Sequence, residues 1–396
     1  MQTGDGLLVR LIPQQPISIA AFVAVCEASE SCGNGIVEIT QRGSLQIRGL
    51  TTTSVPRFAQ AVARLDIAHD GVPVLTSPLH GFDPLETDYS RSLTIALRET
   101  LRERSGAPLS AKVSVLIDTA GKLHLDAVTS DIRLRASECG RRFHISVGGD
   151  ARNATALGWV DSERIIAAVS EILDLIADQG PAVRARDLTP QHLSVLQEHL
   201  KSDPQAEPGP QVRQSCEPLG IHAQRDGRVT FGCALAFGHA TAGSLRRLAY
   251  VAADCGASAL RPAPARAMLA FGLSREAACE LCAAAEALGF VVEAGDSRRF
   301  VVACAGAPAC SSATLATRQL APEVAAAAQG IANSSKVIHL SGCTKGCAHP
   351  GPAALTIAGP DLYIVGGRAG DAPAGRISSS EWPACIERIC QDLGSV

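Results

Sequence analysis

The chain of 396 residues is long enough for two or more domains, and 46% hydrophobic against 19% charged residues is typical of a folded globular protein. A net charge of −3 and an aromatic content of 4% argue against binding of nucleic acid. The N-terminal sequence lacks a signal peptide, and no run of 18 apolar residues could cross a membrane. We therefore expect a cytoplasmic protein whose 14 cysteines are thiols or metal ligands.

An internal repeat organises the chain. Residues 6–50 align with residues 229–273 at a constant offset of 223, without a gap. Each copy predicts a strand, a helix and two strands, and a further helix is expected near residues 55–65 and 275–288. The repeat therefore predicts two ferredoxin-like β-α-β-β-α units.

A second kind of segment follows each copy. The sequences that begin at Lys112 and Lys336 alternate apolar and polar residues around glycine turns, which predicts β-hairpin strands. The resulting fold class is α+β, with two ferredoxin-like half-domains and two mixed αβ domains in a pseudo-twofold arrangement. The predicted units are half-domain A (1–72), domain B (73–200), a linker (201–220), half-domain A′ (221–295) and domain B′ (296–396).

The two strands of the first copy, in EITQRGSLQIRG, predict a hairpin with one polar face. Thr40, Gln46 and Arg48 alternate with apolar residues, and Arg42 lies at the turn. Because the planar guanidinium of arginine bonds two oxygens at once, this face suits carboxylates. A sheet face that only meets water is the alternative.

The second copy has lost these polar residues, which indicates that the two copies are specialised. The first copy would then bind an anionic ligand that the second copy could not. At the offset of 223, Arg10 becomes Cys233, Arg42 becomes Ala265, Gln46 becomes Leu269 and Arg48 becomes Phe271.

Two cysteine pairs in domain B′ form the pattern C-x5-C…C-x3-C. Cys304 and Cys310 follow one predicted strand, and Cys343 and Cys347 follow another. Four thiolates suit a [4Fe–4S] cluster or a zinc ion, although zinc ligands are usually two to four residues apart. Four unrelated buried thiols are the alternative.

This paired motif, in the second half of a duplicated chain, resembles the sulfite/nitrite reductase superfamily. There the four cysteines hold a [4Fe–4S] cluster, and the last one also bridges to the iron of sirohaem. The resemblance implies the cluster ligands Cys304, Cys310, Cys343 and Cys347.

The hairpin is also similar to a feature of that superfamily. Its T-x-R-x(3)-Q strand pair holds the carboxylates of the tetrapyrrole. The resemblance implies four tetrapyrrole-binding residues, which are Thr40, Arg42, Gln46 and Arg48.

The chain differs from the reductases in the residues expected near the sirohaem iron. In the reductases, several Arg and Lys side chains converge there. Arg10 and Lys112 match two of these active-site positive charges. Ser114 stands where a second basic residue is expected, and no arginine lies near Val72. Because reduction of an oxyanion needs this charge and its protons, the loss argues against sulfite or nitrite as the substrate.

The segments GDGLLVRLIP and GNGIVEITQRGSLQIRGL are similar to the precorrin-3B synthase branch of the superfamily. That resemblance implies a monooxygenase of aerobic cobalamin biosynthesis, which hydroxylates a meso carbon of precorrin-3A and closes a γ-lactone. Its partners would be precorrin-3A, O₂ and a reductant such as NADH or an electron-transfer protein.

The branch is also implied to carry a mononuclear non-haem iron. His349 is the nearest candidate ligand, and a turn histidine that bonds the backbone is the alternative. His80, His124 and Asp83 are further candidates.

Two other functions stay open from the sequence. One is a sulfite or nitrite reductase that contains sirohaem and is linked to ferredoxin or NADPH. The other is a non-catalytic tetrapyrrole carrier or a scaffold stabilised by zinc.

Overall fold

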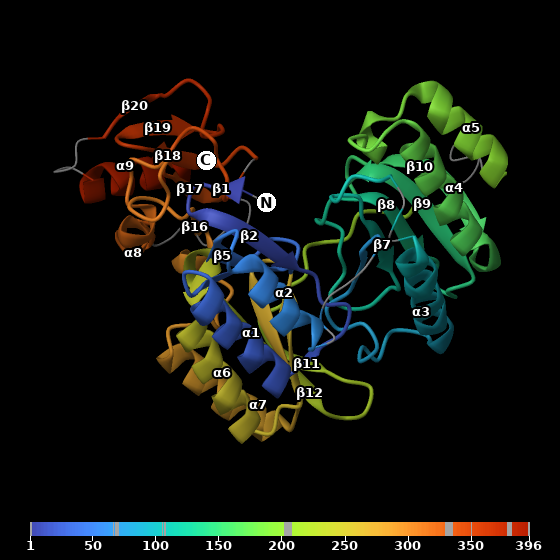
Figure 1. Ribbon diagram of the computed structural model, residues 1–396, viewed down its shortest axis with the longest axis horizontal. Coiled ribbons are helices and arrows are strands. Elements are labelled where there is room, and N and C mark those ends of the chain that lie inside the picture. The colour runs from blue at the N-terminus through green and yellow to red at the C-terminus, as the bar shows by residue number, and fades with distance from the viewer. Residues whose placement is uncertain are drawn as a thin grey trace.

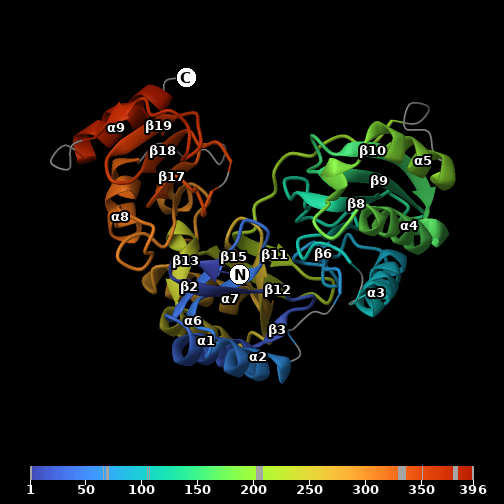
Figure 2. The same cartoon turned by 45° about the horizontal axis from the view of Figure 1, so that its top comes forward.

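The computed structural model describes residues 2–65, 67, 71–104, 106, 108–201, 208–328, 336–349, 351–377 and 382–394. Half-domains A and A′ form a central body, and domains B and B′ stand on either side of it (Figure 1). Figure 2 shows the same separation of B from B′ after a turn of the molecule. Among the described residues no helix is both long and apolar enough to cross a membrane.

The central body contains two five-stranded sheets, and each borrows one short strand from the other copy. Strand β13 pairs with β4 of the first copy, and β3 pairs with β14 of the second. This exchange ties the two copies together. The sheet orders are β1(Gln2–Thr3)-β2(Gly6–Leu11)-β5(Leu45–Leu50)-β4(Ile36–Ile39)-β13(His239–Thr241) and β11(Gly220–Ala223)-β12(Val229–Ala234)-β15(Ala267–Leu273)-β14(Ala259–Ala263)-β3(Ile17–Ser18).

Four helices cover these sheets, and one hydrophobic core draws residues from both copies. Ser18 and Thr241, which are 223 residues apart, each cap a helix by accepting a backbone N–H at their hydroxyl oxygen. The repeat in the sequence is therefore a repeat in the structure. The helices are α1 (Ile19–Cys32), α2 (Val55–Ala63), α6 (Ala242–Asp254) and α7 (Arg275–Ala287), and the 3-10 turn η3 (Ala236–Gly238) precedes β13.

Domain B is a five-stranded sheet with helices on its faces. Its first three strands pair in parallel, and each of the last two pairs antiparallel with the strand before it. Its elements are β6 (Val74–Thr76), α3 (Asp88–Glu103), β7 (Val115–Asp118), β8 (Ser130–Ala136), β9 (Arg142–Gly149), β10 (Thr155–Asp161), η1 (Ser162–Arg164), α4 (Ile165–Asp178), η2 (Ala185–Asp187) and α5 (Pro190–Leu200).

Domain B′ repeats this topology, with three parallel strands followed by two antiparallel ones. Residues 359–361 join β18 to β19, which pair antiparallel. The elements of B′ are η4 (Ser297–Arg299), β16 (Val301–Ala303), α8 (Thr317–Ala327), β17 (Ile338–Ser341), β18 (Leu355–Ala358), β19 (Leu362–Val365), β20 (Gly375–Arg376) and α9 (Trp382–Gly394).

The predicted α+β fold with its duplicated plan is confirmed, but one local prediction is wrong. The segment from Lys112 forms β7 and β8, which pair in parallel rather than as a hairpin. Alternation of apolar residues predicts a strand but carries no information on its pairing direction, and residues 119–129 carry the chain across instead of turning it back. The domain boundaries stay predictions, and residues 202–207 of the linker lie outside the described residues.

Candidate functional site

The four cysteines meet at one edge of the B′ sheet. Strands β16 and β17 are parallel neighbours, so their carboxyl ends lie side by side, and Cys304 and Cys343 follow directly from them. The backbone N–H of Gly342 donates to Cys304 Sγ at 3.1 Å. This contact brings the second cysteine pair against the first.

Cys347 is exposed, whereas the other three cysteines of the motif are half-buried. Burial raises the pKa of the Cys347 thiol, and the neighbouring thiols of Cys343, Cys304 and Cys310 raise it further. The two pairs are therefore close enough to interact. Within the described part of the chain, no three His, Cys, Asp or Glu side chains gather around a single point. The chemistry of the donors, four thiols on small-residue turns with one backbone N–H bonded to Cys304 Sγ, is nevertheless that of a [4Fe–4S] site.

The polar face of the first hairpin forms a row across four strands of the central sheet. His239, Glu38, Gln46 and Arg10 lie opposite one another on β13, β4, β5 and β2. Arg10 Nη2 donates to Gln46 Oε1 at 2.7 Å, and Gln46 Nε2 donates to Glu38 Oε2 at 3.0 Å. Thus the structure brings together Arg10 and Gln46, which are 36 residues apart in the sequence.

Arg48 lies next to this row and is bound by carboxylates of the chain itself. Its Nε and Nη2 atoms donate to the two oxygens of Asp5 at 2.8 and 2.6 Å, and Nη1 donates to Glu38 at 3.2 Å. Glu38 also accepts from Arg318 of α8 at 3.3 Å. Arg318 lies only eight residues after Cys310, so this ion pair joins the hairpin face to domain B′, which contains the four cysteines.

The turn of the hairpin points at domain B. Thr40 Oγ1 accepts from the backbone N–H groups of Arg42 and Ser44, so its hydroxyl shapes the turn. Arg42 donates through Nη2 to Thr129 of domain B, and it lines a pocket that also includes Arg261. Burial lowers the pKa of Arg42, as do the nearby charges of Arg184 and Arg10. Arg184 is itself paired with Asp131, whose charge partly offsets this effect, so the positive charge that suits an anionic ligand here comes from Arg42 and Arg10.

The second copy has no such site, because its hairpin packs directly against domain B. Leu269 and Phe271 belong to an apolar cluster with Leu79, and the Phe271 ring lies 4.9 Å from that of Phe82. The predicted asymmetry between the two copies therefore has a structural basis: one hairpin face is polar and the other is core.

Three polar residues of the site were not among the ligands predicted from the sequence. Asp5 and Arg318 lie far from the hairpin in the sequence, and no local pattern marks them. Glu38 stands inside the motif and alternates with the predicted residues, so its position could have revealed it.

The other predicted residues lie apart from this face. Lys112 is exposed in the turn before β7, and the described residues show no contact between it and Arg10 or the hairpin. His349 Nε2 lies 3.1 Å from the Pro352 carbonyl oxygen, which is the structural role given as its alternative. Its ring is 5.8 Å from that of the buried His339.

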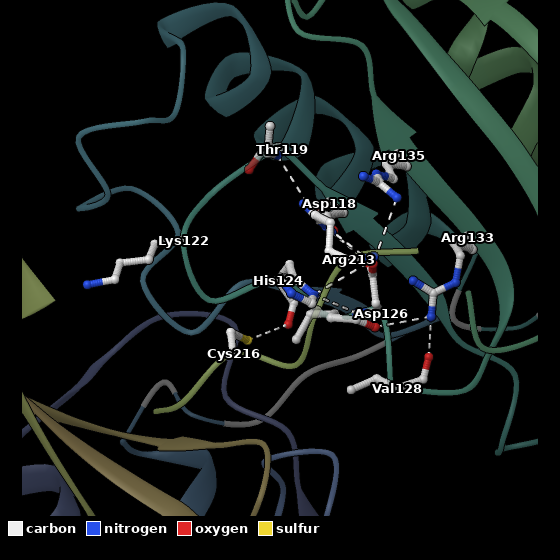
Figure 3. Close-up of polar contacts among 12 residues, drawn as sticks. Asp118, Thr119, Lys122, His124, Asp126, Val128, Arg133, Arg135, Arg213 and Cys216 are labelled. Carbon is white, nitrogen blue, oxygen red and sulfur yellow. Dashed lines mark hydrogen bonds and ion pairs between the residues drawn. The ribbon is translucent and has the colours of Figure 1, made fainter. Parts of the chain in front are cut away.

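The remaining candidates for iron ligands are engaged in structural contacts. His80 Nδ1 lies 2.9 Å from Glu86 Oε1, and Asp83 accepts two backbone N–H groups. His124 belongs to a network of polar contacts in domain B (Figure 3). Its Nε2 lies 2.6 Å from the carbonyl oxygen of Gln214 in the predicted linker.

Arg213 of the linker is the centre of that network. It donates to Asp118, and to Asp126 Oδ1 at 2.6 Å (Figure 3). Burial by itself would raise the pKa of Asp126, but hydrogen bonds from His124 and Arg213 hold it well below its usual range. Arg213 and Gln214 therefore tie this part of the predicted linker to domain B.

Comparison with models of known protein families finds no match. The chain is 36% identical over 397 residues to the precorrin-3B synthase of a Sinorhizobium species, which covers 98% of this chain and 86% of that protein. It is 24% identical over 430 residues to the assimilatory ferredoxin-dependent nitrite reductase of Haloferax mediterranei, covering 91% of this chain and 72% of the relative. It is also 24% identical over 408 residues to the ferredoxin–nitrite reductase of Synechococcus elongatus, covering 91% and 78%.

Among solved structures, the NirA protein of Mycobacterium tuberculosis has the same fold. The TM-score is 0.74 at 19% sequence identity, and the match covers 97% of this chain and 80% of that one. The fold and the relatives therefore define a member of the sulfite and nitrite reductase superfamily. Within it, the chain belongs to the precorrin-3B synthase family, and it is an oxidoreductase-type enzyme.

Proposed function

We propose that the protein is a precorrin-3B synthase of aerobic cobalamin biosynthesis and acts in the cytoplasm. It hydroxylates a meso carbon of precorrin-3A, after which an acetate side chain closes a γ-lactone. One atom of O₂ enters the product and the other leaves as water, so a reductant such as NADH or an electron-transfer protein supplies two electrons and two protons. The observation that carries this proposal is the identity of 36% over nearly the whole chain.

The polar hairpin face supports a polycarboxylate tetrapyrrole as the substrate. Arg10 and Gln46 share one row of side chains, and Arg42 extends from the turn toward domain B. Arginine and amide side chains hold carboxylates by charge-assisted hydrogen bonds. Of the predicted residues, we assign carboxylate binding to Arg42 and Gln46, with Arg10 as a positive charge beside them. Thr40 shapes the turn that presents Arg42, Arg48 is already paired with Asp5, and Lys112 lies apart from this face.

The four cysteines would hold a [4Fe–4S] cluster, which supplies one-electron transfer that no side chain of the protein can provide. The chain's own residues then bind the ring, orient it and exclude water. A mononuclear non-haem iron is a further proposal, with His349 as the nearest ligand. The described residues do not show a second and third ligand beside it.

The test is incubation of the anaerobically purified protein with precorrin-3A, a reductant and ¹⁸O₂, followed by mass analysis. The expected product has gained one ¹⁸O atom. Arg42→Met should weaken precorrin-3A binding about 10-fold to 100-fold, since a hydrogen bond to a charged group contributes about 1.5–3 kcal/mol. Arg102→Met is the matched control, because Arg102 lies exposed at the end of α3, away from the hairpin.

The visible spectrum tests the alternative. The relatives named as nitrite reductases favour a second candidate, a sirohaem-dependent reductase. Sirohaem bound at one equivalent per chain, together with no oxygen gain by precorrin-3A, would replace the first proposal by the second. Zinc without iron or sulfide would favour a non-catalytic scaffold.

A further inference from the structure

The N-terminal turn lies between the polar hairpin face and the cysteines of domain B′. Strands β1 and β2 pair at Thr3 and Gly6, so the chain reverses within a few residues. Thr3 Oγ1 closes the turn by hydrogen bonds to Asp5 Oδ1 at 2.8 Å and to the Gly6 carbonyl oxygen at 2.7 Å. The left-handed φ of 115° at Gly6 favours glycine there.

One side of this turn is held by Arg48. The guanidinium binds both oxygens of Asp5, and the Asp5 side chain is only 2% exposed. Burial by itself would raise the pKa of Asp5, but the hydrogen bonds and charge of Arg48 bring it below the usual value. Asp5 is therefore a buried carboxylate paired with a buried guanidinium, and loss of either partner would leave an uncompensated charge.

The other side of the turn contacts the cysteine loop. The Gly4 carbonyl oxygen accepts from the backbone N–H of Ser311 at 3.1 Å and from its hydroxyl at 3.2 Å. A Cβ atom added to Gly4 would lie 2.2 Å from Cys310 Sγ, which is far closer than two such atoms can approach. A side chain at this position would therefore displace the Cys310 thiol or the turn.

Cys310 needs such support more than Cys304 and Cys343 do. Cys304 and Cys343 come directly after strands β16 and β17, whose ladder fixes their backbones. Cys310 lies in the irregular segment between β16 and α8, where its own N–H donates to the Gly306 carbonyl oxygen at 2.8 Å.

We propose that the turn at Gly4 and Asp5, locked by Arg48, positions Cys310 as a cluster ligand and covers its thiolate. Asp5 and Arg48 act through Gly4 and Ser311, so they are positioning residues rather than catalytic ones. The proposal rests on the proposed cluster but not on the tetrapyrrole reaction. It also gives Arg48 a role in holding the cluster site, which leaves Arg10, Arg42 and Gln46 to meet the ring.

The test compares Gly4→Ala with Gly106→Ala. The change is the same at both positions, but a Cβ at Gly106 meets no atom within 4 Å. After anaerobic reconstitution, Gly4→Ala should fall from about four iron atoms per chain to about three or fewer, with the EPR signal of a three-iron cluster, since one thiolate ligand is displaced. Gly106→Ala should match the wild type. Equal iron content and equal EPR spectra in Gly4→Ala and the wild type would overturn the proposal.

A second variant, Asp5→Asn, keeps the shape of the side chain and removes its charge. Bleaching of the cluster near 400 nm in air should accelerate about 10-fold, because the charge-assisted hydrogen bonds that hold the turn over Cys310 are lost. An unchanged bleaching rate would overturn the role of the ion pair. This variant keeps the test decisive if Gly4→Ala does not fold.

A binding titration separates this proposal from the proposed function. Uroporphyrin, an octacarboxylate tetrapyrrole, is titrated into the wild type and Asp5→Asn by fluorescence quenching. Equal affinity is expected if Arg48 serves the cluster site. Tighter binding to Asp5→Asn would show that Arg48 is a ring ligand held back by Asp5, which would overturn the assignment of Arg48. If no uroporphyrin binds to either protein, the proposed function fails, while the iron and bleaching measurements still decide this inference.

Discussion

His339 offers a prediction that can be worked through from the structure. It lies on β17, its side chain is fully buried, and among the described residues neither ring nitrogen has a hydrogen-bond partner. Burial lowers its pKa to about 4, and the nearby His349 and Arg266 act in the same direction. Folding therefore holds this imidazole in its neutral form at neutral pH.

The sign of the pH effect follows from that direction. In the unfolded chain the pKa of histidine is about 6.5, so the unfolded state binds more protons than the folded state once the pH falls below that value. The contribution of neutral His339 to stability is full above pH 6.5 and is lost progressively as the pH falls toward about 4. At pH 5 the loss from this residue is about 2 kcal/mol, because each pKa unit corresponds to about 1.4 kcal/mol.

The substitution His339→Leu removes the titrating group and keeps an apolar side chain of similar size. Urea unfolding followed by circular dichroism at pH 7.5 and pH 5 measures the effect. The variant should lose about 2 kcal/mol less than the wild type between the two pH values. His199→Leu is the control, since His199 is exposed on α5. An equal loss in His339→Leu and the wild type would refute the reasoning.

Three further predictions follow from the packing. Cys343→Ser should lose the cluster's iron and sulfide, whereas Cys279→Ser, on the exposed face of α7, should keep them; retention in Cys343→Ser would contradict the ligand set. Phe271→Ala should lower the free energy of unfolding by about 3–5 kcal/mol, measured by urea titration, because the second hairpin is core. Arg213→Met should lower it by about 3–5 kcal/mol, because it removes the guanidinium that pairs with the buried carboxylate of Asp118 and also binds Asp126; a loss below about 1 kcal/mol would show that these ion pairs contribute little to stability.

Features whose signal lies in a short stretch of the sequence, such as helices, strands and the cysteine pairs, could be predicted. The offset of 223 residues located both copies, since helix caps and alternating strands are local patterns that survive duplication. The cysteine pairs could be found because each one follows a strand. The pairing direction of β7 and β8 could not, because apolar alternation is the same in parallel and antiparallel strands.

The contacts across the copies needed the tertiary structure. Strands β3 and β13 are two and three residues long, too short to mark which sheet they join. The partners of the polar hairpin could not be predicted either. Nothing near Arg48 in the sequence indicates that its guanidinium binds the carboxylate of Asp5, which is 43 residues away.

The sequence by itself therefore determined the duplicated plan, the four-cysteine motif and the loss of polar residues from the second hairpin, because each is a local or periodic property of the chain. The tertiary structure alone decided which charges are paired. Asp5 and Arg318 reach the first hairpin from two distant segments and there pair with Arg48 and Glu38. Their ion pairs exist only because folding brings those segments together, and a charge removed from water must find its partner wherever the fold places one.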